Sequence, residues 1–236
     1  MITDDERKEI LSKISEIEAT VVSRDGRAVS MREIGEAAVH ISARLATSSD
    51  ALMPVLRTAL VINWREAAMK LRYDRFRTKF PEVSTLESLK QVMDEVEPVE
   101  FSRTYLDIKA SSDRNPKYRL LRGLTDGFLE YQHSAGQVAE IEAIRHWAEQ
   151  VNLKKLKSDP IGRIHGVGPA VVENIRLNLG LSVVKPDRHV IGVMEKFLQV
   201  EIPRGSYGEF ADRIGMDRRY FDSIAFEYGK EKSISG

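Results

Sequence analysis

Helix start signals and apolar residues at helical spacing recur along this chain of 236 residues, and they constrain its fold more than any other feature. Three segments open with the pattern S/T-x-x-E, in which a hydroxyl and a carboxylate satisfy backbone N–H groups of the first helical turn. These pairs are Thr3 with Glu6, Ser30 with Glu33, and Ser84 with Glu87. Apolar residues then recur every three or four positions. The sequence therefore predicts an all-α protein of roughly ten short helices.

Other helices are predicted from apolar runs and their boundaries. The run over 52–62 is apolar enough for a buried helix, and it gives way to a basic amphipathic stretch over 65–79. Pro116 after Asn115 suits the first position of a further helix. The segment 20–29 carries a β-hairpin pattern, but a single hairpin is only marginally stable, so we interpret this segment as a turn between helices.

Composition excludes several kinds of site. The chain contains no Cys, so it has no disulfide, no cysteine nucleophile and no cysteine-ligated zinc or iron–sulfur cluster. Its His residues follow no metal-binding spacing, and the common nucleotide phosphate-loop motifs are absent. We therefore expect no metal and no nucleotide cofactor.

The chain also lacks the signals of a membrane or exported protein. It has no window of about 18 apolar residues, and its N-terminus begins MITDDE rather than with a basic and then an apolar run. We therefore expect a soluble, cytoplasmic protein with no membrane partner. We also expect it to be a monomer.

Charge is balanced overall but unevenly distributed. The chain has 36 basic and 36 acidic residues, whereas residues 51–79 have 7 and 2, a net charge of +5. Residues 80–100 sum to −5 and residues 151–236 to +3. Two basic segments therefore flank an acidic middle, and each is either a solvated helix face or part of a surface for an anionic partner.

The segment 159–180 contains the most informative motif. Gly166-Val167-Gly168 follows a predicted short helix and precedes a helix that opens at Pro169. Glycines adopt backbone angles that other residues avoid, so this tripeptide can form a tight hairpin with outward N–H groups at a helix N-terminus. Such groups suit a phosphate, although an ordinary turn between helices has the same sequence pattern.

This setting resembles the helix-hairpin-helix of DNA-binding proteins. The segment 183–190, VVKPDRHV, is similar to the loop and aspartate that follow this hairpin in base-excision DNA glycosylases of the endonuclease III superfamily. The resemblance extends loosely over 52–228 and leaves residues 1–48 outside it, as an N-terminal helical extension. It implies a glycosylase-like domain over 49–236, with an aspartate loop over 181–190 and two helical subdomains that form a cleft.

The resemblance also implies the roles of residues. Asp187 matches the catalytic carboxylate of the family, and backbone N–H groups of Gly166, Val167, Gly168 and Ala170 match its phosphate contacts. A carboxylate beneath C1′ stabilises the oxocarbenium charge that develops when an N-glycosidic bond breaks, and it can orient or deprotonate water. Alternatively, Asp187 only caps the helix that follows, and one residue can do both.

Two departures from the family pattern narrow the expected chemistry. Bifunctional members carry a nucleophilic lysine where this chain has Ala170, so the resemblance implies water-mediated excision without a Schiff base. The iron–sulfur cluster of many relatives is excluded by the lack of Cys, and only a monovalent cation at the hairpin is left as an implied ligand.

Base excision requires that the target nucleotide leave the stack while a side chain fills the gap. The family's wedge position matches the segment 62–65, so Asn63 and Trp64 are candidate wedge residues, and Trp64 also suits the core. Further basic residues are candidates for sequence-independent phosphate contacts. They are Arg65, Lys70, Arg72 and Lys185.

We therefore expect a monofunctional DNA glycosylase that removes a damaged or mispaired base from duplex DNA. One alternative is a non-catalytic helix-hairpin-helix protein that only binds DNA. Another is a helical interaction protein in which residues 166–168 form a simple turn.

Overall fold

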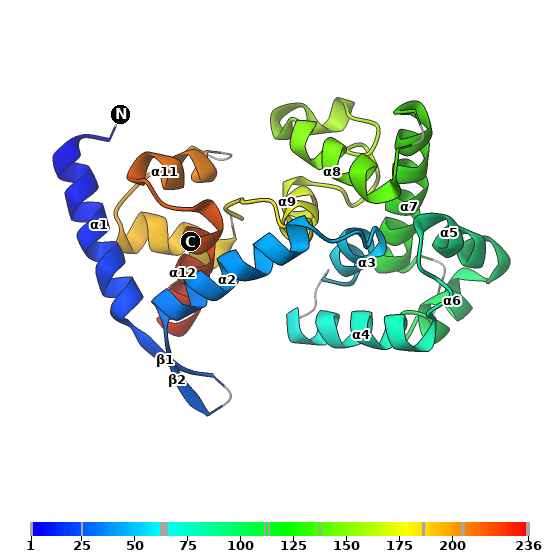
Figure 1. Ribbon diagram of the computed structural model, residues 1–236, viewed down its shortest axis with the longest axis horizontal. Helices are drawn as coiled ribbons and strands as arrows, with labels where there is room; N and C mark the ends of the chain where they lie inside the picture. Colours follow the sequence, from blue (N-terminus) through cyan, green and yellow to red (C-terminus); the bar gives the residue numbers. More distant parts are fainter. Residues whose placement is uncertain are drawn as a thin grey trace. The chain divides into compact units, whose positions relative to one another are not determined.

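The computed structural model describes residues 2–24, 26–61, 66–110, 112, 114–136, 138–185, 187–203 and 206–234. Regular structure in these ranges is helical apart from one two-stranded sheet (Figure 1), in agreement with the predicted all-α class. In chain order the elements are α1 (Asp4–Ala19), β1 (Val21–Arg24), β2 (Arg27–Ser30), α2 (Met31–Ala46), α3 (Leu52–Val61), α4 (Glu66–Lys79), α5 (Leu86–Glu95), α6 (Pro98–Thr104), α7 (Pro116–Ser134), α8 (Glu140–Gln150), the 3₁₀ helix η1 (Leu153–Ser158), α9 (Pro169–Asn178), α10 (Arg188–Gly192), the π-helical turn η2 (Val193–Phe197), α11 (Tyr207–Ile214) and α12 (Arg218–Glu231).

The chain divides into two compact units. Residues 1–47 and 180–236 form one, which we call the terminal unit, and residues 48–179 form the other, the central unit. This division differs from the expected one, in which residues 1–48 extend from a domain over 49–236. Residues 1–47 instead share their unit with the C-terminal part of the chain.

The core of the terminal unit gathers α1, α2 and the helices of the C-terminal segment. Helices α2 and α12 approach closely at Gly35, where an added Cβ would lie 2.6 Å from the Tyr220 ring. The Tyr220 hydroxyl also donates a 2.6 Å hydrogen bond to Glu18 of α1. Phe210 and Phe221 pack edge to face in the same core. Contacts between the first and last segments of the chain thus hold this unit together.

The interpretation of residues 20–29 as a plain turn was wrong, because the segment forms the antiparallel pair β1–β2. Val21 lies opposite Ser30, and Arg24 lies opposite Arg27. Val22 is buried in the core of the terminal unit, which supplies the apolar contact that an isolated hairpin lacks.

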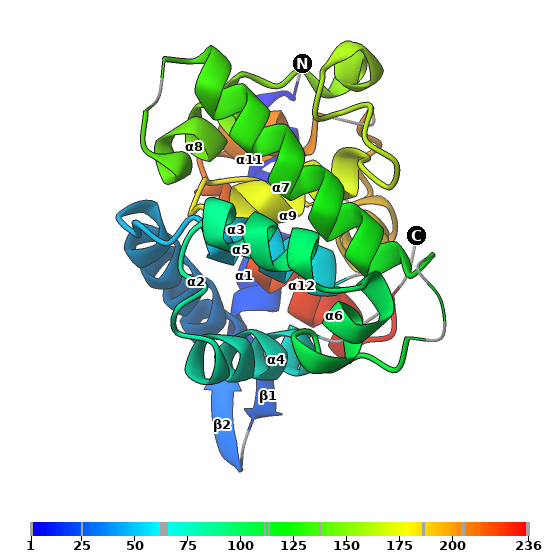
Figure 2. The same ribbon diagram turned by 90° about the vertical axis from the view of Figure 1, so that its right-hand side faces the viewer.

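The core of the central unit centres on α3, which packs against α4, α7 and α9, while α5 and α7 lie side by side (Figure 2). Eight of the ten α3 residues are buried, as its continuous apolar run predicts. Phe128 of α7 meets Trp147 of α8 in an edge-to-face contact. None of the described helices is long and apolar enough to cross a membrane.

The predicted helix starts are confirmed at three places and displaced at one. Thr3 with Glu6 and Ser30 with Glu33 form complete capping boxes, and Asn115 caps α7 with Pro116 at its first turn. The start of α5 is displaced by one residue, because Thr85 is the cap and its box closes through Ser88. The next two N–H groups of α5 donate instead to Glu140 of α8, a contact between distant segments.

Candidate nucleic-acid interface and catalytic loop

The segment 166–168 forms a tight bend directly before α9. Gly166 has φ of +92°, in the left-handed region that favours glycine, and Gly168 is the extended N-cap with Pro169 in the first turn. Val167 between them is buried, with an exposed fraction of 2%. A buried anchor between two backbone-exposed glycines therefore fixes the bend to the central unit.

Three backbone amides at the bend and in the first turn of α9 are open. The Val167 N–H donates to the Ile164 carbonyl at 3.0 Å, whereas the N–H groups of Gly166, Gly168 and Ala170 donate to no other residue that the structure describes. Three N–H groups of five successive residues at the start of a helix are thus left for a ligand or water, in an arrangement that suits an anion.

Gly168 is suited to its N-cap position, but neither its surroundings nor its backbone angles demand a glycine. A Cβ added there would meet nothing within 4 Å, and the φ of −139° is accessible to any residue. Neither packing nor backbone strain therefore requires glycine at this position. Glycine is typical of positions where a ligand approaches the backbone closely.

The residues before the bend differ from the predicted short helix. They form η1 and a series of turns, and Asp159 organises the turns by accepting N–H bonds from Ile161 (2.9 Å) and Gly162 (2.7 Å). Ile164 docks against Gly123 of α7, where a Cβ would lie 2.6 Å from it. The structure therefore shows a bend and one regular helix, α9, where the sequence predicts a hairpin between two helices.

Sequence reasoning passed over a group of cations that precedes the bend in the sequence. The sequence indicates this group locally, because the segment 154–163 contains four basic residues and one acidic residue, Asp159. All four side chains are exposed, and the Nζ of one of them, Lys157, also donates to the Val167 carbonyl at 3.0 Å. These cations are Lys154, Lys155, Lys157 and Arg163.

Asp187 is the N-cap of α10, as one of the two interpretations of the sequence expects. Its Oδ1 accepts N–H bonds from His189 (2.8 Å) and Val190 (3.0 Å), and the side chain is half-buried. Its Oδ2 accepts no hydrogen bond from the part of the chain that the structure describes. The carboxylate is thus oriented by one oxygen while the other stays available.

Asp222, which sequence reasoning missed, lies behind the aspartate loop. It is 5% exposed, and its Oδ1 accepts the Lys185 N–H at 2.7 Å while its Oδ2 pairs with Arg219 at 2.9 Å. Burial raises the pKa of this carboxyl to about 6, although Arg219 and the Lys185 N–H lower it. No local pattern marks it, because its loop partner is 37 residues away in sequence.

The other predicted residues fall in different units or outside the described residues. Asn63, Trp64 and Arg65 lie outside the described residues. Lys70 is exposed on α4, and Arg72 donates from Nε to the Asp107 carbonyl at 3.4 Å. Lys185 belongs to the aspartate loop in the terminal unit, whereas Lys70, Arg72 and the bend belong to the central unit.

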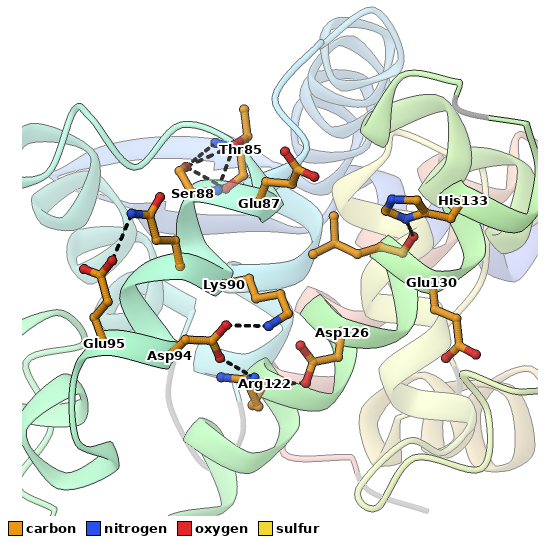
Figure 3. Close-up of a pocket in the computed structure, with 12 residues that line it drawn as sticks. Thr85, Glu87, Ser88, Lys90, Asp94, Glu95, Arg122, Asp126, Glu130 and His133 are labelled. Atoms are coloured by element: carbon orange, nitrogen blue, oxygen red, sulfur yellow. Dashed lines mark hydrogen bonds and ion pairs between the residues drawn. The ribbon is translucent and has the colours of Figure 1, made fainter.

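A groove of about 900 Å³ lies on the central unit at α5 and α7 (Figure 3). Arg122 donates from Nε to Asp126 at 2.7 Å and also pairs with Asp94. Five carboxylates and only two Lys or Arg side chains line this groove, so its charge disfavours phosphate. A groove of about 530 Å³ in the terminal unit is also rich in carboxylates, and neither groove includes Asp187 or the bend.

The described residues contain no cluster of three or more His, Asp or Glu side chains that could hold a metal ion. A scan against protein-family models, a search of curated proteins and a search of solved structures found no significant match to the chain.

Proposed function

We propose that this chain is a DNA glycosylase that binds duplex DNA and hydrolyses the N-glycosidic bond of a damaged or mispaired base. The observation that carries this proposal is the bend at 166–168 with the start of α9, which together present three open N–H groups and a glycine that packing does not require. The proposal also draws on the resemblance of segment 183–190 to the aspartate loop of base-excision glycosylases.

In the proposed binding mode, the amides of Gly166, Gly168 and Ala170 contact one backbone phosphate. They lie at the positive end of the α9 dipole, which adds to the attraction for an anion. Backbone amides carry no information about base identity, so this contact is independent of DNA sequence. The exposed cations at 154–163 add charge in the segment before the same bend and make binding sensitive to salt.

In the proposed reaction, Asp187 acts on the deoxyribose. Two N–H bonds to Oδ1 fix the orientation of the carboxylate. Oδ2 is then the atom that stabilises positive charge at C1′ and accepts a proton from the attacking water. The base leaves with the bonding electrons and takes up a proton from solvent, water supplies the new C1′ oxygen, and Asp187 returns to solvent the proton that it accepted. Because Ala170 replaces the lysine nucleophile, the product is an intact abasic strand.

The test compares the wild-type protein with two variants on duplexes that carry a panel of alkylated, oxidised, deaminated and mispaired bases. Asp187→Asn should keep its affinity for DNA within several-fold and lose at least about 100-fold in excision. Gly168→Ala should lose no more than about 1 kcal/mol in free energy of unfolding, because its Cβ enters open space and alanine is only a weaker N-cap than glycine. It should lose about tenfold or more in affinity.

Asp212→Asn is the matched control, because this exposed carboxylate in the same unit pairs with Arg218 and does not touch the loop. It should match the wild type in both assays. Borohydride should trap no covalent adduct with DNA, since no Schiff base forms. Full excision by Asp187→Asn would overturn the catalytic assignment, and wild-type affinity in Gly168→Ala would overturn the phosphate site.

One observation favours a second candidate, a non-catalytic DNA-binding protein. The two N–H bonds that Asp187 accepts are a sufficient reason for Asp at this helix cap. Salt-sensitive binding of undamaged duplex DNA by the wild type, without excision of any base in the panel, would support this candidate over the glycosylase.

A further inference from the structure

Asp222 is a buried carboxylate in α12 that bonds to the backbone of the aspartate loop. Its Oδ1 accepts the Lys185 N–H at 2.7 Å, and the Lys185 carbonyl in turn accepts the Asp187 N–H at 2.8 Å. We propose that Asp222 is a positioning residue, which fixes the backbone of Asp187 through Lys185 and thereby the direction of the proposed catalytic carboxylate. The catalytic part of this inference rests on the proposed function.

A second contact holds the beginning of the loop to the same helix. The Ser182 hydroxyl donates to Asp217 at 3.2 Å and accepts the Arg219 N–H at 3.3 Å. Asp217 caps α12, so Ser182 is bound to the first turn of this helix and Lys185 to the second. The loop is thus held at two points before the chain reaches Asp187.

The chemistry of Asp222 favours a specific role over a packing role. The carboxylate is 5% exposed, and an apolar side chain would fill this space without the cost of removing a charge from water. Its raised pKa agrees with that cost, and the nearby negative charge of Asp187 contributes to it. Buried carboxylates whose charge is unfavourable cluster at functional sites. A backbone N–H in a loop needs an acceptor, and Asp222 provides it where the loop meets α12.

The experiment separates positioning from folding with two substitutions at one site. Asp222→Ala removes the acceptor of the Lys185 N–H, whereas Asp222→Asn keeps an acceptor oxygen but loses its charge. Asp212→Ala is the control, since it removes an exposed carboxylate with an arginine partner from the same unit. For each protein we would measure kcat and Kd on the best duplex of the lesion panel, and hydrogen exchange at the amides of residues 185 and 187.

Asp222→Ala should lower kcat by about tenfold to 100-fold, with Kd within about twofold of wild type, because the reacting carboxylate is misplaced while the phosphate site is intact. Exchange at the Lys185 amide should be about tenfold faster. Asp222→Asn should lose only about threefold in kcat, and Asp212→Ala should behave as wild type. Wild-type kcat in Asp222→Ala, or an equal loss of kcat in both Asp222 variants, would overturn the proposal.

Two further outcomes are also decisive. If Asp222→Ala does not fold, Asp222→Asn decides. A loss of about tenfold or more in kcat with wild-type exchange at residue 185 would overturn the proposal, because the bond to the loop would then be intact while activity still depended on the charge. If the wild type excises no base, the proposed function fails separately. Exchange at residues 185 and 187 then decides the positioning itself: faster exchange in Asp222→Ala than in Asp212→Ala supports it, and equal exchange overturns it.

Discussion

The buried charge of Asp222 predicts a dependence of stability on pH that can be measured without DNA. Burial raises the pKa of this carboxyl from 3.8 to about 6. Between these two values the folded protein keeps a proton that the unfolded chain has already released. The contribution of Asp222 to the free energy of unfolding therefore falls as pH rises through this window, with the opposite sign to that of an ordinary ion-paired carboxylate. Asn does not titrate in this range, so the free energy of unfolding of Asp222→Asn does not show this decrease with rising pH.

The magnitude follows from the shift. A difference of about 2.2 pH units corresponds to about 3 kcal/mol at 1.36 kcal/mol per unit. Between pH 4.5 and pH 7.5 the contribution of Asp222 to the free energy of unfolding decreases by about 2 kcal/mol, and the rest of the change occurs below pH 4.5. The pair with Arg219 lowers the pKa of Asp222, so its effect is already included in this shift. The unfolding free energy of Asp222→Asn minus that of wild type should thus rise by about 2 kcal/mol.

Urea denaturation followed by circular dichroism at half-unit steps of pH measures this difference. Asp212→Asn is the control, because Arg218 lowers the pKa of the exposed Asp212 carboxyl and the sign is therefore reversed. A flat difference curve for Asp222→Asn would show that Arg219 and the Lys185 N–H compensate fully for burial. A falling curve would show that the carboxyl is stabilised in its charged form, and either result would refute the reasoning.

Three other substitutions test the fold. Gly180→Ala should lower the free energy of unfolding by at least about 2 kcal/mol in urea denaturation, because Gly180 has φ of +74° and an added Cβ would lie 2.2 Å from the Ser42 carbonyl oxygen. Lys117→Met should cost about 1–3 kcal/mol in the same assay, since it removes the 2.7 Å bond from Nζ to the buried Leu60 carbonyl. Asn115→Ala should cost about 1 kcal/mol in thermal denaturation, because the Asn115 side chain caps two N–H groups of α7. A loss below about 0.3 kcal/mol in any of the three would contradict the corresponding contact.

Features set by neighbouring residues could be predicted from the sequence. The capping boxes at Thr3 and Ser30 and the start of α7 at Pro116 each depend on contacts within four residues. The bend at Gly166 is equally local, because its positive φ is a property of glycine. The cap of Asp187 belongs to the same class, since it spans only three residues.

Features that depend on distant segments could not be predicted. The hairpin at 21–30 is stable because Val22 joins the core of the terminal unit, and the pattern alone does not show that core. The N-cap of α5 is Thr85 rather than the predicted Ser84, and Glu140 of α8 accepts the N–H bond of the next residue, Leu86. Asp222 could not be found either, since an acidic residue in a helix is normally solvated and only its long-range contact with Lys185 distinguishes it.

The pairing of residues 1–47 with residues 180–236 has a consequence for how the protein is made. During translation the N-terminal helices leave the ribosome well before the helices that bury their apolar faces have been synthesised. The continuous stretch 48–179 has all of its partners sooner and can complete its core first. The unit that carries Asp187 therefore completes its core only after residues 180–236 have been synthesised.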